Sequence, residues 1–462
     1  MNEQLEQLDK EYVLHTYARN YVNFTKGINA TLFDDKNKDY IDFTSGIAVC
    51  SVGHGNKRVA DKIYEQISNI THISNLYGIE PQAKLAKRLA ELSGYDIRTF
   101  FSNSGAEANE GAIKIARKYG ETKFENKKYK VITLEHSFHG RTITTVKATG
   151  QESMHTPNFA PYPDGFSYKS TVAEVYDSID EQTVAVMIEL VQGEGGVQPF
   201  EKQEIQDLAK FLKEKDILLI VDEVQTGVYR TGEFLASNLY EIEPDIVTLA
   251  KGLGGGVPIG AIMTKLKDIF SPGDHGSTFG GNYLVTTAAL EVLEILEEIK
   301  DSGELDETII YFNRKLNEIY ENNKEIFTAN VGLGLMRGLR AKDADTLALV
   351  IKTAFEEGVL VLKAGKNTLR LLPALTHHPV VVLQHLRRGQ ARLRLLADDG
   401  EKLDQAVKLR ELVGHLIELD PFVGLEPAVL LAGVIEHAGG DLDDELLAIL
   451  RVGQIDGIIR ID

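Results

Sequence analysis

Short apolar runs alternate with longer helix-like segments through the middle of the chain. Strands are expected at residues 184–190 (VAVMIEL), 217–222 (ILLIVD) and 245–251 (DIVTLAK), because short apolar runs rich in β-branched residues are typical of buried strands. Between the first two, residues 204–215 (EIQDLAKFLKEK) have the periodicity of an amphipathic helix. This alternation predicts an α/β domain with a mainly parallel sheet.

The pattern changes after this region. Helical periodicity runs through residues 286–299 and again near 306–326, and the second segment leads into a glycine-rich strand region at 331–341 (VGLGLMRGLRA). We expect the chain to leave the large domain here and enter a smaller α/β one. The extended-looking residues 30–43 (ATLFDDKNKDYIDF) are expected to pair with that smaller domain.

The last 86 residues have a composition of their own. Residues 377–462 contain 2 Lys, 7 Arg, no Tyr and no Asn, whereas all 17 Tyr lie before them. Segments such as EKLDQAVKLRELVGHLIEL predict amphipathic helices, so we interpret the tail as a helical appendage or a fused module for oligomerisation or partner binding. Its histidines His377, His378 and His385 lack the usual ligand spacings, and no metal site is expected.

Composition limits the possible functions. The formal charge of -19 argues against binding to nucleic acid or to anionic membranes, since both are polyanions. With Cys50 as its single cysteine, the chain has no intrachain disulfide. It lacks a signal-peptide pattern at its first residues and any apolar run near the roughly twenty residues that span a bilayer. We therefore expect a cytoplasmic protein.

Three ionisable residues lie at the carboxyl ends of the predicted strands. They are Glu189, Asp222 and Lys251, and in parallel α/β sheets ligands bind beyond the carboxyl ends of the strands. Desolvation at a strand end would lower the pKa of Lys251 and leave a nucleophilic amine suited to Schiff-base chemistry. Taken alone, an ordinary strand-end lysine is the more common case.

The neighbouring motifs favour pyridoxal phosphate. This cofactor needs a lysine for its aldehyde, an acid at its ring nitrogen, donors for its phosphate and a flat contact above the ring. Asp222 supplies the acid, and residues 102–118 (SNSGAEANEGAIKIARK) predict a helix N-terminus that would bind phosphate. In HSFHGRT, Phe138 could stack on the ring and Arg141 could hold a carboxylate.

Nine motifs in order resemble those of the class III pyridoxal-phosphate aminotransferases of fold type I, over residues 10–376. They are DFTSGIAV, HISNLYG, FFSNSGAEANE, FHGRT, QGEGG, VDEVQTGVYRTG, AKGLGGGVPIGA, HGSTFGGN and TLRLLPALT. The resemblance implies a large domain with a mainly parallel, seven-stranded type of sheet and a smaller α/β domain. The expected divisions are 1–50 for an N-terminal part of the small domain, 51–289 for the large domain, 290–376 for the rest of the small domain, and 377–462 for the tail.

The resemblance assigns most of the cofactor contacts. Lys251 would bind the cofactor covalently and, once released, move a proton between substrate and cofactor. Asp222 would pair with the ring nitrogen and Gln225 with the ring oxygen. Phe138 would stack on the ring.

The phosphate contacts would come from two subunits. Backbone N–H groups of Gly105 and Ala106 would bind the phosphate, and Thr278 from the neighbouring subunit would complete the site. The resemblance therefore implies a homodimer with shared active sites.

Substrate contacts follow from the same resemblance, which is strongest to members acting in arginine biosynthesis. These transfer the terminal amine of N2-acetyl-L-ornithine to 2-oxoglutarate, giving N-acetyl-L-glutamate 5-semialdehyde and L-glutamate. Arg141, with Ser277 beside it, would hold the acetylornithine carboxylate. Arg370 would bind that of 2-oxoglutarate or glutamate, and Glu194 would mask Arg370 while the amine donor is bound.

Some alternatives stay open. Ornithine, 4-aminobutyrate or succinyl-diaminopimelate could be the amine donor, because the catalytic residues are common to those ω-aminotransferases. Glu189 is interpreted as a structural partner near the cofactor and Glu223 as an orienting or ion-pairing acid. His54 and His139 are expected to be structural histidines with satisfied hydrogen bonds.

Overall fold

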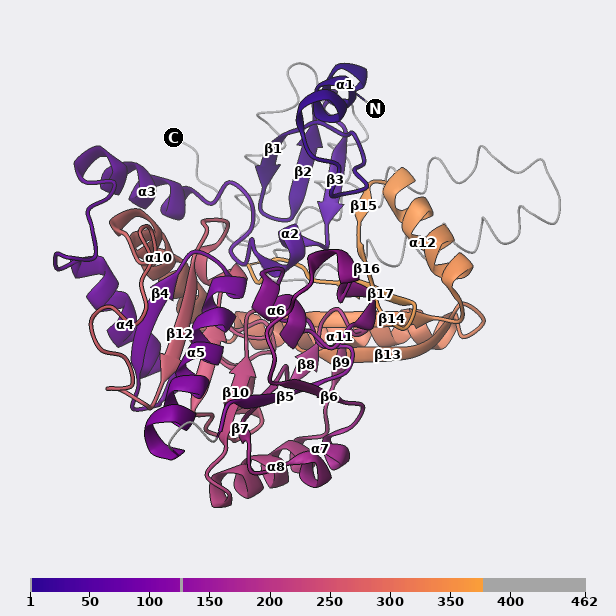
Figure 1. Ribbon diagram of the computed structural model, residues 1–462. Helices are drawn as coiled ribbons and strands as arrows, with labels where there is room; N and C mark the ends of the chain where they lie inside the picture. The colour runs from indigo at the N-terminus through magenta and orange to yellow at the C-terminus, as the bar shows by residue number, and fades with distance from the viewer. Residues whose placement is uncertain (1, 125–127, 377–462) are drawn as a thin grey trace, which may run out of the picture. The chain divides into compact units, whose positions relative to one another are not determined.

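The computed structural model describes residues 2–124 and 128–376, and a seven-stranded sheet lies at the centre of this part of the chain (Figure 1). In spatial order its strands are β4 (Arg98–Ser102), β12 (Gly260–Thr264), β11 (Ile246–Leu249), β10 (Leu218–Asp222), β7 (Thr183–Ile188), β5 (Lys130–Leu134) and β6 (Phe166–Lys169). From β11 to β6 all neighbours are parallel, and β12 is antiparallel to both β11 and β4. The predicted mainly parallel sheet is therefore confirmed.

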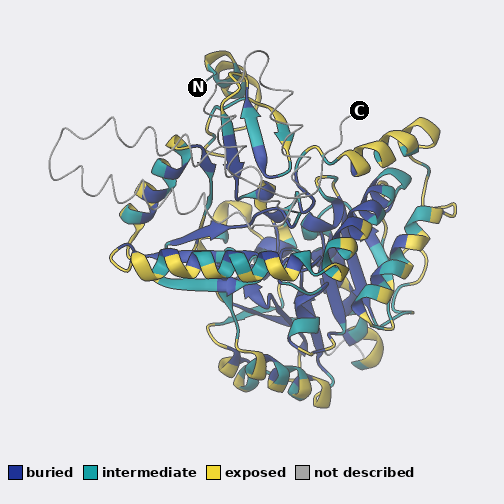
Figure 2. Cartoon of the chain, turned by 180° about the vertical axis from the view of Figure 1, so that it is seen from behind, coloured by how far each residue is buried: buried dark blue, intermediate teal, exposed yellow. Residues whose placement is uncertain are grey.

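The sheet is covered on both faces, which explains why its central strands are continuous apolar runs rather than alternating ones. On one face, side chains such as Met187 and Ile220 pack with Ala112 and other residues of α5 (Gly105–Phe124). On the other face, Ile188 and Val221 pack with residues of α7 (Val172–Ser178) and α8 (Lys202–Glu214). Figure 2 shows these strands as buried and the outer faces of the covering helices as exposed.

Two smaller sheets lie beside the large one. The first has the order β1 (Phe24–Ile28), β2 (Thr31–Asp34), β3 (Asp39–Asp42) and β15 (Val359–Leu360). Because β3 pairs with β15, the predicted association of residues 30–43 with the later part of the chain is confirmed. The second has the order β13 (Phe327–Leu333), β14 (Met336–Ala341), β17 (Thr368–Leu371) and β16 (Leu362–Ala364).

The glycine-rich region at 331–341 contains parts of two strands rather than one. β13 and β14 pair as an antiparallel hairpin, and its turn contains Gly334 with a φ of 56°. A positive φ is accessible to glycine at little cost. This is the physical reason for a glycine in a sequence that otherwise looks like a continuous strand.

The helices predicted from periodicity are present, and the other elements complete the described chain. Helices 286–299 and 306–326 correspond to α10 (Tyr283–Asp301) and α11 (Glu304–Asn322). The remaining helices are α1 (Glu3–Tyr12), α2 (Ser45–Ala48), α3 (Lys57–Asn69), α4 (Glu80–Ser93), α6 (Ile143–Ala148), α9 (Ala236–Leu239) and α12 (Ala344–Glu356), with 3-10 helices η1 (Glu152–Met154), η2 (Pro157–Phe159) and η3 (Lys251–Gly254). A short antiparallel pair joins β8 (Val191–Gln192) to β9 (Gln198–Pro199).

Some sequence predictions lie beyond this description. The predicted helical tail at 377–462, with His377, His378 and His385, falls outside the described residues. The domain limits at residues 50, 289 and 376 remain predictions. None of the helices in residues 2–124 and 128–376 is both long enough and apolar enough to cross a membrane.

Candidate active site

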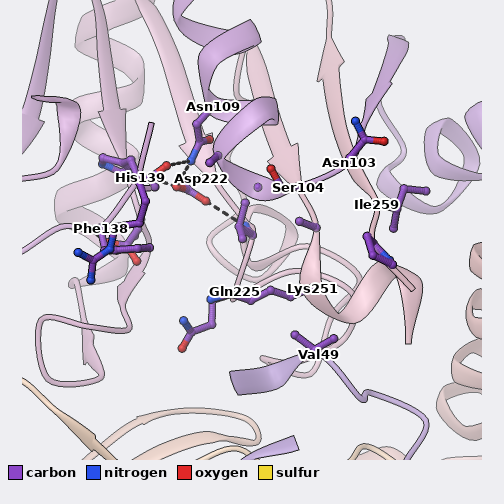
Figure 3. A pocket seen from close by; sticks show the side chains of 18 of the residues that line it. Val49, Asn103, Ser104, Asn109, Phe138, His139, Asp222, Gln225, Lys251 and Ile259 are labelled. Atoms are coloured by element: carbon purple, nitrogen blue, oxygen red, sulfur yellow. Dashed lines mark hydrogen bonds and ion pairs between the residues drawn. The ribbon is translucent and has the colours of Figure 1, made fainter. Parts of the chain in front are cut away.

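A cavity of about 400 Å³ lies at the carboxyl ends of the parallel strands. Glu189, Asp222 and Lys251, the three residues predicted to meet at this edge, all line it. Further lining residues follow β4 and β5, while Ile259 precedes the antiparallel β12. Figure 3 shows the side chains from these separate segments around the cavity.

Asp222 is held by a network of buried hydrogen bonds. Its Oδ2 accepts from Asn109 Nδ2 at 2.7 Å and from His139 Nδ1 at 2.8 Å, and its Oδ1 accepts from the Val224 N–H at 3.0 Å. Only 4 % of Asp222 is exposed. The carboxylate is thereby fixed in one orientation with its charge desolvated, which strengthens its interaction with a cation in the cavity.

Lys251 begins the 3-10 helix that follows β11, and its φ of 39° places it in the left-handed region. Burial lowers its pKa to about 8, and the positive charge of Arg370 contributes in the same direction. Its amine forms no hydrogen bond or ion pair with another side chain of the described residues. A lysine of this kind has a larger neutral, nucleophilic fraction near neutral pH than an ordinary lysine.

The N-terminus of α5 faces the cavity. Gly105 and Ala106 line it, and the first N–H groups of a helix have no intrahelical acceptor. A Cβ atom on Gly105 would lie 2.7 Å from Cγ1 of Val224, so only glycine fits this close approach. The helix has 20 residues, and its aligned dipole adds a favourable field for a phosphate.

Phe138 and Arg141 also line the cavity. The Arg141 guanidinium carbon lies 5.5 Å from the centre of the Phe138 ring. The Phe138 N–H donates to Glu189 Oε2 at 3.0 Å, and the Gly193 N–H donates to Glu189 Oε1 at 3.4 Å. Burial raises the pKa of Glu189 to about 7. Glu189 therefore joins two loops that border the cavity.

Gln225, Arg370 and Glu194 form a connected group at one side of the cavity. Arg370 Nη1 donates to Glu194 Oε1 at 2.5 Å and to Gln225 Oε1 at 3.3 Å. Gln225 lines the cavity, and Arg370 is 3 % exposed. The structure thus brings Arg370 and Glu194 together next to the cavity, and their roles toward the two substrates stay predictions.

Four predicted site residues do not line this cavity in the single chain: Glu194 and Arg370, which lie beside it, and Ser277 and Thr278. Ser277 and Thr278 precede α10 and do not line it. Ser277 Oγ accepts a hydrogen bond from Asn103 Nδ2 at 3.1 Å, and Asn103 does line the cavity. Thr278 is exposed, and its role in a neighbouring subunit stays a prediction.

The second acid of the Asp222–Glu223 pair has a different surrounding. Glu223 is 1 % exposed and accepts from the N–H groups of Ala236 and Ser237, both at 2.7 Å, and from the hydroxyls of Ser237 and Thr226. It orients the start of α9. Of the two expected roles, orienting or ion-pairing, the orienting one fits these contacts, because the donors around this carboxylate are neutral.

Sequence reasoning missed Asn109 and underestimated His139. Asn109 lies four residues after Gly105, on the same face of α5, and this spacing could have identified it. His139 Nδ1 has a partner in Asp222, but its Nε2 is buried without one among the described residues. The expectation of a fully satisfied His139 was therefore wrong.

Comparison with known proteins agrees with this geometry. The family model described as aminotransferase class-III matches residues 13–382. The chain belongs to the class III aminotransferases. It is 60% identical over 390 residues to the acetylornithine aminotransferase of Wolinella succinogenes, which covers 84% of this chain and 98% of that protein. The class III enzyme of Aquifex aeolicus with the same name is 41% identical over 391 residues, or 83% of this chain and 99% of its own.

Solved structures of the class lead to the same fold. The ornithine aminotransferase of Toxoplasma gondii has a TM-score of 0.78 at 30% identity, with 90% of this chain and 94% of that chain covered. The N-acetylornithine aminotransferase of Stenotrophomonas maltophilia has a TM-score of 0.69 at 28% identity, with 90% and 100% covered. The fold type I architecture is therefore confirmed.

Class III aminotransferases depend on pyridoxal 5′-phosphate, and the residues present fit this cofactor. The fit rests on the glycine approach at Gly105, the fixed carboxylate of Asp222 and the low pKa of the Lys251 amine. Across residues 2–124 and 128–376 no group of three or more acidic, histidine or cysteine side chains is arranged to hold a metal ion. The chain is a pyridoxal-phosphate-dependent transaminase.

Proposed function

We propose that this enzyme transfers the terminal amino group of N2-acetyl-L-ornithine to 2-oxoglutarate, a step of arginine biosynthesis. The products would be N-acetyl-L-glutamate 5-semialdehyde and L-glutamate. The observation that carries this proposal is the 60% identity to the Wolinella succinogenes enzyme over 98% of that protein. Such similarity extends over most of the chain rather than over isolated motifs.

Pyridoxal phosphate, when bound, supplies an aldehyde for the amine and a ring that accepts electrons from the substrate. In our proposal the Lys251 amine holds this aldehyde in the resting enzyme. After release, the same amine takes a proton from the substrate carbon that bears the nitrogen and passes it to the cofactor. A pKa of about 8 suits both directions of this transfer near neutral pH.

The remaining cofactor contacts would orient the ring. Asp222 would accept a hydrogen bond from the ring nitrogen and keep it protonated, and Gln225 would contact the ring oxygen. Phe138 would cover one face of the ring. The N–H groups of Gly105 and Ala106 would bind the phosphate.

The two substrates require different carboxylate contacts. Acetylornithine reacts through its terminal amine, whereas glutamate reacts through its α-amine. We propose that Arg141, together with Ser277, binds the acetylornithine carboxylate while Glu194 masks Arg370. When 2-oxoglutarate or glutamate binds, Glu194 moves away and Arg370 binds the carboxylate of that substrate. The Glu194–Arg370 contact of 2.5 Å supports the masked state.

The complete site would include a second subunit. We propose a homodimer in the cytoplasm, in which Thr278 of each chain contacts the phosphate bound by the other. Thr278 is exposed and lies outside the cavity of its own chain, and this position supports a contact with a neighbour. Sedimentation of the purified protein would measure the assembly.

A panel of amine donors tests the substrate assignment. With 2-oxoglutarate held constant, kcat/KM should be highest for N-acetylornithine among that donor, ornithine, 4-aminobutyrate and succinyl-diaminopimelate. Lys251→Ala serves as the inactive control, which identifies any contaminating transaminase. A higher kcat/KM for one of the other donors would overturn the substrate assignment while leaving the family membership intact.

A further inference from the structure

Asn109 lies next to the cofactor acid and has every polar group engaged. Its Nδ2 donates to Asp222 Oδ2 at 2.7 Å and to the His139 carbonyl at 2.8 Å. Its Oδ1 accepts from the Thr248 hydroxyl at 2.7 Å. The amide can form two donor bonds and accept at its oxygen, so this arrangement is satisfied in one orientation only.

The opposite orientation of the amide is strongly disfavoured. A flip would turn Oδ1 toward the Asp222 carboxylate and the His139 carbonyl, which are both acceptors, and both hydrogen bonds would be lost, whereas the Thr248 hydroxyl could still accept from the turned NH₂ group. Asn109 is 1 % and Thr248 is 0 % exposed, so water does not compensate the lost bonds. The two acceptors, Asp222 and the His139 carbonyl, therefore fix which end of the amide faces Asp222, and the Thr248 hydroxyl holds the opposite end in place.

The fold places these residues together through strand register. Asp222 ends β10, and its partner across the parallel β10–β11 ladder is Thr248. Partners in register direct their side chains to the same face of a sheet, and α5, which carries Asn109, packs on that face against Ile220 and Ile246. Figure 3 shows Asn109 and His139 converging on Asp222.

The hydrogen bonds leave a single acceptor position on the acid. A carboxylate has about four lone-pair positions, and Asn109, His139 and the Val224 N–H occupy three of them. Since Asp222 lines the cavity, the fourth position on Oδ1 is the one open to a ligand. The network thus sets both the position and the remaining acceptor of the acid.

We propose that Asn109 is a positioning residue for Asp222, with Thr248 fixing its amide, so that Oδ1 is presented to the cofactor ring nitrogen. The inference rests on the proposed role of Asp222 and does not depend on the identity of the amine donor. Loss of the Asn109 contact would let the carboxylate rotate. The ring nitrogen would then be paired less well and would carry less positive charge, so the Lys251 nitrogen bonded to the cofactor would lose its proton at a higher pH.

Asn109→Ala tests this directly in the full-length holoenzyme. We expect the Kd for pyridoxal phosphate, measured by reconstitution of the apoprotein without amine donor, to rise about five- to tenfold. The midpoint of the pH titration of the cofactor's visible absorption should move upward. These two readouts report the cofactor environment, whereas a purely structural residue would change the melting temperature alone.

Thr248→Val provides a second variant if Asn109→Ala does not fold. It should weaken cofactor binding and shift the titration in the same direction, and Thr248→Ser, which keeps the hydroxyl, should restore both values. Thr133→Val is the matched control, because Thr133 is a fully buried strand residue of the same sheet whose hydroxyl has no partner in the described chain. Wild-type Kd and titration midpoint in both Thr248→Val and any folded Asn109→Ala would overturn the proposal.

Discussion

Glu194→Gln would show how strongly the acid masks Arg370. The substitution keeps the shape of the side chain and an oxygen that accepts from Arg370, but it removes the negative charge. In our proposal 2-oxoglutarate binds Arg370 only after the Glu194–Arg370 contact of 2.5 Å has been broken. A neutral partner is easier to displace, so 2-oxoglutarate should bind the variant more tightly.

The magnitude follows from the surroundings of the pair. Opposite charges centred about 4 Å apart attract by roughly 4 kcal/mol at an effective dielectric constant near 20. The Arg370 side chain is 3% exposed but that of Glu194 is 30% exposed, and solvent screening reduces the net value to about 1–2 kcal/mol. This corresponds to a decrease of about 5- to 30-fold in the KM for 2-oxoglutarate.

Steady-state kinetics with both substrates varied measures this effect. The KM for acetylornithine should change little, because its carboxylate is assigned to Arg141. Glu241→Gln is a suitable control, since Glu241 forms an exposed pair with Lys202 at which charge removal should have no kinetic effect. An unchanged or increased KM for 2-oxoglutarate in Glu194→Gln would refute the masking argument.

Three further variants test other groups. Burial lowers the pKa of Lys251 to about 8, so the rate at which added cofactor colours the apoprotein should rise to about pH 8 and then level off. Lys251→Ala should show no covalent attachment of the cofactor by mass spectrometry. A rate that still increases toward pH 10 would contradict the low pKa. Burial raises the pKa of Glu189 to about 7, above the value of about 4.3 in an unfolded chain. An acid whose pKa is raised by folding destabilises the folded state once it is ionised, so the free energy of unfolding of the apoprotein should fall by on the order of 3 kcal/mol as the pH rises between these values. In urea unfolding, the free energy of Glu189→Gln should depend less on pH over this range. Equal pH dependence in the two proteins would refute the effect. Glu223→Ala should lower the free energy of unfolding by roughly 2–5 kcal/mol, because two buried N–H groups at the start of α9 lose their acceptor, and a melting temperature equal to wild type would show that water replaces the carboxylate.

Sequence patterns predicted the sheet and the edge that carries the ionisable residues, because both follow from the local pattern of apolar and polar residues. Apolar runs at 184–190 and 217–222 indicated buried strands, and the parallel arrangement then placed Asp222 and Lys251 at one edge. Motif order supplied the family. These features can be predicted without knowledge of tertiary contacts.

Other features depend on contacts between distant segments. The spacing from Gly105 places Asn109 on the same face of α5, but its contact with Thr248 depends on the register of β10 and β11. The surroundings of Glu223 could not be predicted either, since its donors come from residues 226–237 folded back over it. The turn at Gly334 could not be located from the sequence, because glycine occurs both within strands, where it weakens them, and in tight turns.

The carboxyl-end location of the cavity has a consequence for how the protein acquires its cofactor. Its lining runs from Val49 to Ile259 and comes from segments that meet only when the seven strands have assembled. A nascent chain or a fragment lacking any of these segments would hold an incomplete set of contacts. Cofactor binding should therefore occur late in folding. It would stabilise the assembled sheet, since a ligand bound only by the native state shifts the unfolding equilibrium toward that state.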